Sequence, residues 1–276
     1  MSPALYPPSR PQSIGEVLDS GFRIFSATLL RCLPIGVLAM VAQQLHNIYD
    51  ILMRHPLHRF GSGDPLWWVL YGLGMFCGFG FINAILIRQA TALTGSISSG
   101  RAALASGLRR APAAAAVFLF LVLACLVWFL PLLGLPGEYT KWGIAVLAVP
   151  ATYVGVLLSL AWAALIVAGK GIVRSLRYSA QIVRGNWWRT AAVYTVGFVM
   201  VFVFYGLAGV VAAILVPFAG TADIAVITAV SAVIAAALGA VCVPFYTALA
   251  IALFRDLEAR HHAAEQQRQP AEAAVG

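Results

Sequence analysis

The sequence predicts an all-α, polytopic transmembrane helix bundle of six spans in three hairpins, each hairpin preceded by a cytoplasmic interfacial amphipathic helix. Composition is the first reason: 61% of the 276 residues are hydrophobic and 10% are charged, whereas soluble domains carry about a quarter charged residues. The mean hydropathy of +0.88 agrees. The second reason is the length of the apolar runs, since about 20 residues cross a hydrocarbon core of about 30 Å. The runs are continuous rather than alternating, which favours helices over barrel strands.

Six apolar runs indicate a single integral membrane domain over residues 1–256. The spans are roughly 32–52, 66–87, 113–133, 144–168, 190–216 and 224–254. Three prolines, Pro131, Pro150 and Pro244, lie inside runs, where each should kink or end its helix. Beyond the last run, residues 257–276 are polar and rich in Ala, Gln and Glu, which predicts a flexible cytoplasmic tail.

A surface helix is predicted before each hairpin. Ser13-Ile14-Gly15-Glu16 matches a capping box, in which a hydroxyl and a carboxylate each bind a free backbone N–H, and apolar residues follow at helical spacing. The connections at 88–112 and 169–189 are long enough to hold amphipathic helices of their own. The chain therefore reads three times as a surface helix followed by two spans.

The basic residues are divided unequally between the two ends of the spans. Fifteen of the eighteen lie in the N-terminal segment, the two longer connections and the tail, whereas Arg54, Arg59 and Lys141 lie on the opposite side. Lys and Arg accumulate in loops that stay cytoplasmic. Both termini are therefore predicted to be cytoplasmic. The predominance of Arg over Lys and the abundance of Ala hint at a high-GC bacterium.

The most concentrated basic segment, "RSLRYSAQIVRGNWWR" (174–189), predicts an interfacial helix. A helix wound from residue 170 carries one cationic stripe and one mostly apolar stripe at positions 172, 173, 176, 180, 183 and 187. Such a helix lies in the plane of the membrane interface. Gly185 should end it in the left-handed conformation, and Asn186 should cap the next helix.

Two interpretations of this segment remain open. It either fixes topology and anchors the bundle, or selects anionic membrane lipids or a partner protein, with about 1 kcal/mol for each basic residue near an anionic leaflet. The two tryptophans suit the headgroup level. The predicted membrane-interface residues are Lys170, Arg174, Arg177, Arg184, Trp187, Trp188 and Arg189. Because the charge follows the topology so closely, no nucleic-acid partner is expected, while a homo-oligomer or a membrane protein partner stays open.

The sequence indicates no catalytic residue, cofactor or metal site. The ten acidic residues are predicted outside the spans or, in the case of Asp50, at the end of one, so no cluster of titratable groups forms a pocket. His55 and His58, with His46 nearby, could bind a metal on the outer face, but such a group in an exposed loop is usually incidental. Four amide side chains fall within spans and are expected to bond between helices or, alternatively, to line a substrate path: Gln43, Gln44, Asn47 and Asn83.

Two stretches carry a resemblance to a known group. "ALIVAGKGIVRSLRYSAQIVRGNWWRTAAVY" (164–194) and "RPQSIGEVLDSGFRIFSATLL" (10–30) resemble bacterial six-span proteins, which include the YciC-like inner-membrane proteins and the membrane domain attached to some glycerophosphodiester phosphodiesterases. The resemblance implies an integral inner-membrane protein. The catalytic domain of the phosphodiesterases is separate and is not expected in this chain.

These observations lead to one favoured function and one alternative. The favoured function is that of a non-enzymatic multi-pass inner-membrane protein with a role in envelope or membrane organisation, lipid handling or a membrane complex. The alternative is a transporter or permease for a small or lipid-like solute, in which Asn83 and Gln43 would face a cavity. An enzyme acting on lipid would need clustered acids or histidines within the membrane, which the sequence does not offer.

Overall fold

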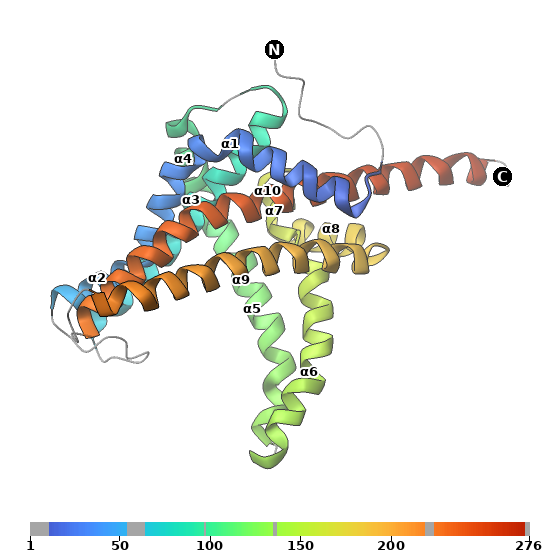
Figure 1. Ribbon diagram of the computed structural model, residues 1–276. Coiled ribbons are helices and arrows are strands. Elements are labelled where there is room, and N and C mark those ends of the chain that lie inside the picture. Colours follow the sequence, from blue (N-terminus) through green and yellow to red (C-terminus); the bar gives the residue numbers. More distant parts are fainter. Residues whose placement is uncertain (1–10, 54–63, 97, 135–136, 219–223, 274–276) are drawn as a thin grey trace.

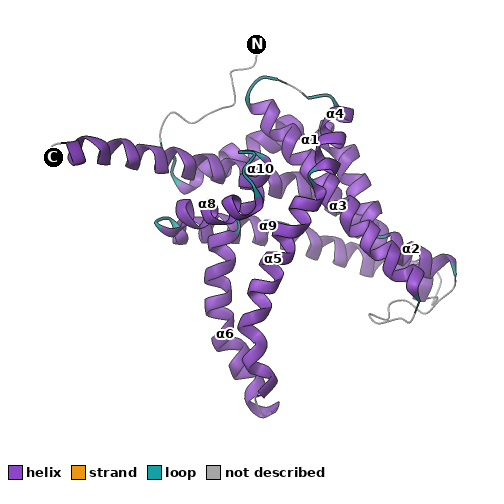
Figure 2. Cartoon of the chain, turned by 180° about the vertical axis from the view of Figure 1, so that it is seen from behind, coloured by secondary structure: helices purple, strands orange, loops and turns teal. Residues whose placement is uncertain are grey.

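In the computed structural model the described residues are 11–53, 64–96, 98–134, 137–218 and 224–273. Within these ranges helices make up nearly the whole chain and there is no strand (Figure 1, Figure 2). The elements are α1 (Ile14–Gln43), α2 (Leu45–Leu52), α3 (Pro65–Leu93), α4 (Gly100–Arg109), α5 (Ala111–Phe129), the 3₁₀ helix η1 (Leu130–Gly134), α6 (Gly137–Leu158), α7 (Ala161–Ile166), α8 (Ile172–Arg184), α9 (Trp187–Phe218) and α10 (Ile224–Ala273).

The predicted fold class, an all-α transmembrane bundle of six spans, is confirmed. Six helical segments in the described ranges are long and apolar enough to cross a membrane: Ile14–Gln43, Pro65–Leu93, Ala111–Leu132, Tyr139–Ile166, Trp187–Val211 and Ala232–Gln267. Their large exposed apolar side chains, such as Val149 (71%), Phe198 (65%) and Phe202 (67%), would be costly in water and suit hydrocarbon. The chain is therefore a multi-pass membrane protein.

The first predicted span was placed too late in the sequence. Residues 14–43 form one helix, so the expected N-terminal surface helix is continuous with the span and is not a separate element. The capping box is confirmed, because the Ser13 N–H donates to the Glu16 carboxylate (2.6 Å) and the Glu16 N–H donates to Ser13 Oγ (3.3 Å). Pro34 lies inside α1 without ending it. The end of the predicted span forms α2 instead.

The last predicted boundary also differs. Residues 257–273, expected to form a flexible tail, continue α10 as regular helix. The reason is visible at the start of this stretch, where Leu257 is fully buried and anchors the extension to the bundle. The predicted surface helices in the two longer connections do form, as α4 and α8.

The three prolines behave differently from one another. Pro131 follows the end of α5 and lies in the 3₁₀ turn η1, as expected of a helix-ending proline. Pro150 and Pro244 lie inside α6 and α10, which continue past them. Pro244 has no N–H, so the Ala240 carbonyl lacks its usual hydrogen bond from the residue four positions later. That carbonyl lies at the α1–α10 contact, where Gly36 approaches too closely for a Cβ to fit.

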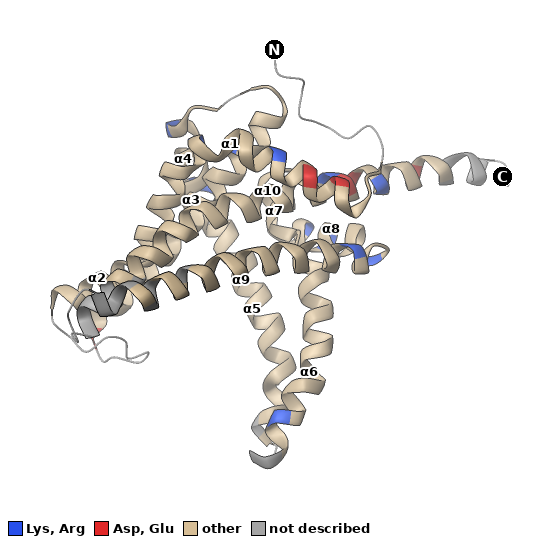
Figure 3. Cartoon of the chain, viewed as in Figure 1, with Lys and Arg blue, Asp and Glu red and all other residues tan. Residues whose placement is uncertain are grey.

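The spans divide into two groups. Helices α1, α3, α9 and α10 pack together, whereas the α5–α6 hairpin projects away from them, with α7 and α8 at its root (Figure 1). Most Lys and Arg positions lie on the side of the molecule that carries α4 and α8 (Figure 3), whereas Lys141 lies near the start of α6, where the α5–α6 hairpin turns. This separation gives the molecule one basic end, next to the root of the hairpin.

Candidate functional site

Helix α8 has the two predicted faces, but its apolar face packs on protein. Leu176, Ile182 and Val183 are buried in the core cluster that includes α7 and α10. Ser175 and Ser179 lie on the same face, and their hydroxyls donate to backbone carbonyls. The apolar residues that remain exposed lie in the first turn, at positions 172 and 173. The helix is therefore held to the bundle by burial and exposes its basic face.

The basic face of α8 lacks counter-charges. Arg174, Arg177 and Arg184 are exposed, and within the described ranges they take part in no hydrogen bond or ion pair. No acidic residue occurs in α8. Lys170, which precedes the helix, lies over the Tyr178 ring at 3.8 Å from the centroid. Three guanidinium groups are thus available to an external anion.

Tyr178 joins α8 to α10. Its hydroxyl donates to Glu258 Oε1 at 3.4 Å. Burial, assisted by the Glu258 charge, raises the pKa of Tyr178 to about 12. The phenol is therefore neutral at physiological pH and remains a hydrogen-bond donor.

The end of α8 corrects two predictions. Gly185 has φ −79° and is right-handed, and the side chain of Asn186 does not cap α9. Instead Asn186 Nδ2 donates to the Ile182 carbonyl (3.4 Å), and its N–H donates to the Val183 carbonyl (2.8 Å). These bonds satisfy the last carbonyls of α8 without a left-handed residue. The glycine near α8 that does adopt the left-handed conformation is Gly169 (φ 63°), in the connection between α7 and α8.

A shallow pocket of about 610 Å³ lies where α6, α8 and α9 meet. We call it the interfacial pocket; it is lined by Val149, Tyr153 and residues 184–189. Trp187 is fixed in it, because its ring stacks on Tyr153 (5.5 Å between centroids) and its Nε1 donates to the Tyr153 carbonyl (3.1 Å). Trp188 meets Trp187 edge-on at 4.6 Å and is 81% exposed. The pocket thus combines one fixed ring, one exposed ring and the unpaired Arg184.

Arg189 plays a different part from the one predicted. Its Nε lies 3.0 Å from Asp256 Oδ2, and Arg260 Nε lies 3.1 Å from the same oxygen. The Gln12 N–H donates to Asp256 Oδ1 at 2.7 Å, and both guanidinium groups donate to the Gln12 carbonyl. Asp256 is fully buried. We call these four residues the Asp256 network; it ties residue 12, the first turn of α9 and α10 together.

Sequence reasoning did not find the Asp256 network. The only signal was the i, i+4 spacing of Asp256 and Arg260, which is common on exposed helices. Arg189 is 67 positions away from Asp256 in the sequence, so no local pattern connects them. Because the network holds the start of α9, it also fixes the backbone from which Trp187 and Trp188 project.

The polar residues predicted within spans make contacts between elements. Asn83 is fully buried; its Nδ2 donates to the Gly107 carbonyl (3.2 Å) and its Oδ1 accepts from Trp162 Nε1 (2.7 Å). Gln43 packs against Gly78 of α3. Asn47 Nδ2 donates to Gln44 Oε1 near the α1–α2 junction.

The histidines lie in separate places. His46 packs edge-on against Trp67 (5.0 Å), whereas His55 and His58 fall outside the described residues. In α10, the possible ligand atoms of His261, His262 and Glu265 lie within 4.8 Å of one another. That group is partly to fully exposed and was not singled out as a metal site by the sequence.

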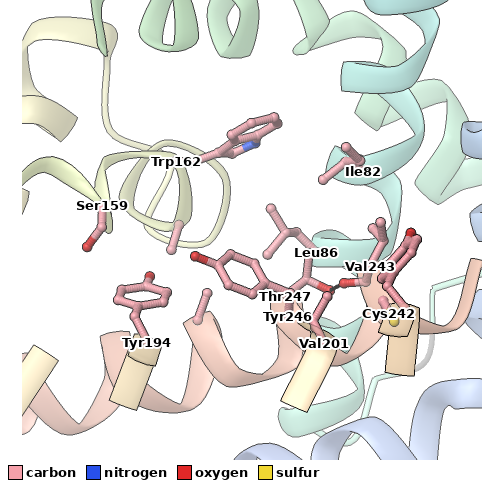
Figure 4. Close-up of a pocket in the computed structure, with 13 residues that line it drawn as sticks. Ile82, Leu86, Ser159, Trp162, Tyr194, Val201, Cys242, Val243, Tyr246 and Thr247 are labelled. Atoms are coloured by element: carbon pink, nitrogen blue, oxygen red, sulfur yellow. Dashed lines mark hydrogen bonds between the residues drawn. The ribbon is translucent and has the colours of Figure 1, made fainter. Parts of the chain in front are cut away.

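A second pocket, of about 330 Å³, lies among α3, α7, α9 and α10 (Figure 4). Its wall is almost entirely apolar and includes Leu86, Trp162, Tyr194, Val201 and Tyr246. We call it the apolar pocket. It involves no residue of the predicted membrane-interface set.

Fold and site together define a multi-pass helical membrane protein with a basic, tryptophan-bearing interfacial pocket. Comparison with known families finds a similarity over residues 139–257 to a family described as a domain of unknown function (DUF7847). The matched part runs from α6 into α10, so it contains α8, both tryptophans and Asp256. No curated protein and no solved structure matches the chain.

Proposed function

We propose that this chain is a non-enzymatic protein of the bacterial plasma membrane that binds anionic lipid headgroups at the interfacial pocket and serves lipid handling or envelope organisation. The observation that carries the proposal is Arg184, an exposed guanidinium without a partner in the described residues, beside the exposed ring of Trp188. Guanidinium groups bind phosphate through paired N–H donors. Tryptophan favours the headgroup level of a bilayer.

The remaining charges favour a lipid over a soluble anion. Arg174 and Arg177 lie on the same exposed face of α8 as Arg184, so they extend the positive surface along the plane in which an anionic leaflet would lie. The resemblance to the YciC-like inner-membrane proteins supports the same location. The basic end of the bundle would then face the cytoplasm, with both termini.

Lipid retention tests this proposal. The purified protein, given equal amounts of phosphatidylglycerol and phosphatidylcholine with identical chains, should retain phosphatidylglycerol preferentially in native mass spectrometry. Arg184→Gln should lower the preference by roughly fivefold, the equivalent of about 1 kcal/mol for one basic contact. Lys141→Gln is the matched control, since this exposed basic residue lies near the start of α6, away from the interfacial pocket. An unchanged preference in the Arg184 variant would refute the proposal.

Reporter fusions test the orientation. A reporter fused after Gly276 should be active only in its cytoplasmic form, and one inserted near Gly61 only in its periplasmic form. The unequal division of basic residues is the reason for this expectation. Reporters active on the same side of the membrane would contradict the six-span arrangement.

The alternative function, a permease for a lipid-like solute, is favoured by one observation, the apolar pocket among the spans. For such a permease the sequence predicts that Asn83 faces a cavity. Both the nitrogen and the oxygen of the Asn83 amide are instead hydrogen-bonded within the bundle. A transport assay with reconstituted protein separates the two functions, because binding alone moves no lipid between leaflets.

A further inference from the structure

The walls of the apolar pocket exclude charged and strongly polar ligands. Its lining contains no charged residue. The hydroxyls of Ser159 and Thr247 donate back to carbonyls of their own helical segments (2.8 and 3.0 Å), and Trp162 Nε1 donates to Asn83. These polar groups are thus already satisfied. A wall of this kind offers dispersion contacts and apolar burial, which suit a hydrocarbon.

Part of the wall of the apolar pocket is exposed at the surface of the spans. Two tyrosines on its wall, Tyr205 and Tyr246, are 38% and 43% exposed. Nearby on α9, Phe198 and Phe202 are largely exposed, as expected of side chains that face lipid. We therefore expect the medium beside these exposed residues to be hydrocarbon. An apolar cavity does not hold water stably, but it accepts apolar ligands.

One face of α9 runs past both pockets. Trp187 lines the interfacial pocket, whereas Tyr194, Val201 and Tyr205 line the apolar pocket. Their spacings of seven, seven and four residues place them on the same side of a helix. At 1.5 Å for each residue, Trp187 and Tyr194 are about 10 Å apart along the helix axis, and Val201 lies about 21 Å from Trp187. One leaflet of the hydrocarbon core is about 15 Å deep.

We propose that the apolar pocket binds one acyl chain of an anionic glycerophospholipid whose headgroup lies in the interfacial pocket. The headgroup end has the unpaired guanidinium of Arg184. The chain end has an uncharged wall at the depth that an acyl chain reaches from that headgroup. This inference rests on the proposed function for its headgroup site, and it adds the chain site and the class of ligand.

The test compares long-chain and short-chain ligands of the full-length protein in detergent. Val201→Trp fills the apolar pocket from α9, and Val203→Trp is the matched control, because Val203 is 51% exposed and does not line the pocket. Dioleoyl phosphatidylglycerol should bind Val201→Trp roughly tenfold more weakly than wild type, since displacing about two methylene groups suffices for that loss. Dihexanoyl phosphatidylglycerol, which supplies the headgroup without a long chain, should bind both variants as it binds wild type.

The outcomes separate the two proposals. Wild-type affinity of Val201→Trp for the dioleoyl lipid overturns the chain site, and so does an equal loss in Val203→Trp. If Arg184→Gln binds both lipids like wild type, the headgroup site of the proposed function is overturned instead. Weakened binding of both lipids by Arg184→Gln, together with a loss confined to the dioleoyl lipid in Val201→Trp, supports both.

A labelling experiment on the wild-type protein guards against misfolding of the filled variant. Phosphatidylglycerol with a photoactivatable group in the middle of one chain, added at one equivalent, should label residues 194–205 of α9 and 242–250 of α10. Addition of unlabelled dioleoyl phosphatidylglycerol should reduce that labelling. Labelling that is confined to the exposed surface of α5, or that unlabelled lipid does not reduce, overturns the chain site.

Discussion

Replacement of Asp256 by Asn tests whether the Asp256 network holds the basic end together. The carboxylate is fully buried and lies between two guanidinium groups, while Arg189 and Arg260 keep 16% and 29% of their side-chain exposure. Removal of one partner of a buried ion pair costs about 3–5 kcal/mol, because the other charge stays desolvated. This cost is reduced because the two arginines are partly exposed and because Asn retains one acceptor oxygen. We expect a loss of about 2–3 kcal/mol in the free energy of unfolding.

The assay is unfolding of the purified protein in mixed micelles by a denaturing detergent, followed by tryptophan fluorescence. Asp19→Asn is the matched control, since its pair with Arg23 also has i, i+4 spacing but is exposed; its cost should stay below about 0.5 kcal/mol. The double variant Asp256→Asn, Arg189→Gln should recover part of the loss, because one uncompensated charge is removed. The reasoning is refuted if Asp256→Asn is no less stable than Asp19→Asn.

Three further predictions concern single side chains. Asn83→Ala should lower the free energy of unfolding by about 1–3 kcal/mol, because it leaves the Trp162 Nε1 donor unpaired inside the bundle. The same unfolding titration measures this loss, and a loss below about 0.5 kcal/mol would contradict the prediction. The pKa of Tyr178 is raised from 10.0 to about 12 in the folded protein, so the contribution of this phenol to stability is complete below pH 10 and is lost as pH rises toward 12. The stability of wild type should therefore fall more steeply than that of Tyr178→Phe between about pH 10 and 12, and equal slopes in this window would count against the prediction. Trp188→Ala should weaken phosphatidylglycerol retention with little loss of stability. Trp187→Ala should reduce both retention and stability, because Trp187 is stacked and hydrogen-bonded. Native mass spectrometry and unfolding titrations measure the two quantities, and a larger loss of stability in Trp188→Ala than in Trp187→Ala would be inconsistent with the pocket.

The fold class could be predicted because it depends on local sequence. A run of apolar residues long enough to cross a bilayer needs no tertiary information. The capping box at residues 13–16 and the amphipathic pattern of α8 are equally local. The lengths of α1 and α10 were harder to predict, since both helices pass from apolar to polar sequence without a break. A search for apolar runs places a boundary where composition changes, although the helix continues.

The basic and aromatic residues on α8 and at the start of α9 could be chosen from the sequence, but the residues of α6 that complete the interfacial pocket and the arrangement of the whole could not. The basic and aromatic residues of 170–189 follow from helical spacing, yet the packing of α8 on protein depends on α6 and α7. Tyr153, which fixes Trp187, lies 34 positions away. The Asn186 side chain could either cap α9 or bind the last carbonyls of α8, and in the structure it binds a carbonyl of α8. The apolar pocket is built by four helices and leaves no pattern in any one segment.

A structure of the full-length protein in nanodiscs that contain phosphatidylglycerol and phosphatidylcholine tests the central claim most directly. The account predicts density for a lipid in the interfacial pocket, with a phosphate oxygen within hydrogen-bonding distance of the Arg184 guanidinium and the exposed ring of Trp188 beside the headgroup. A well-resolved pocket with no lipid phosphate near Arg184 would contradict it.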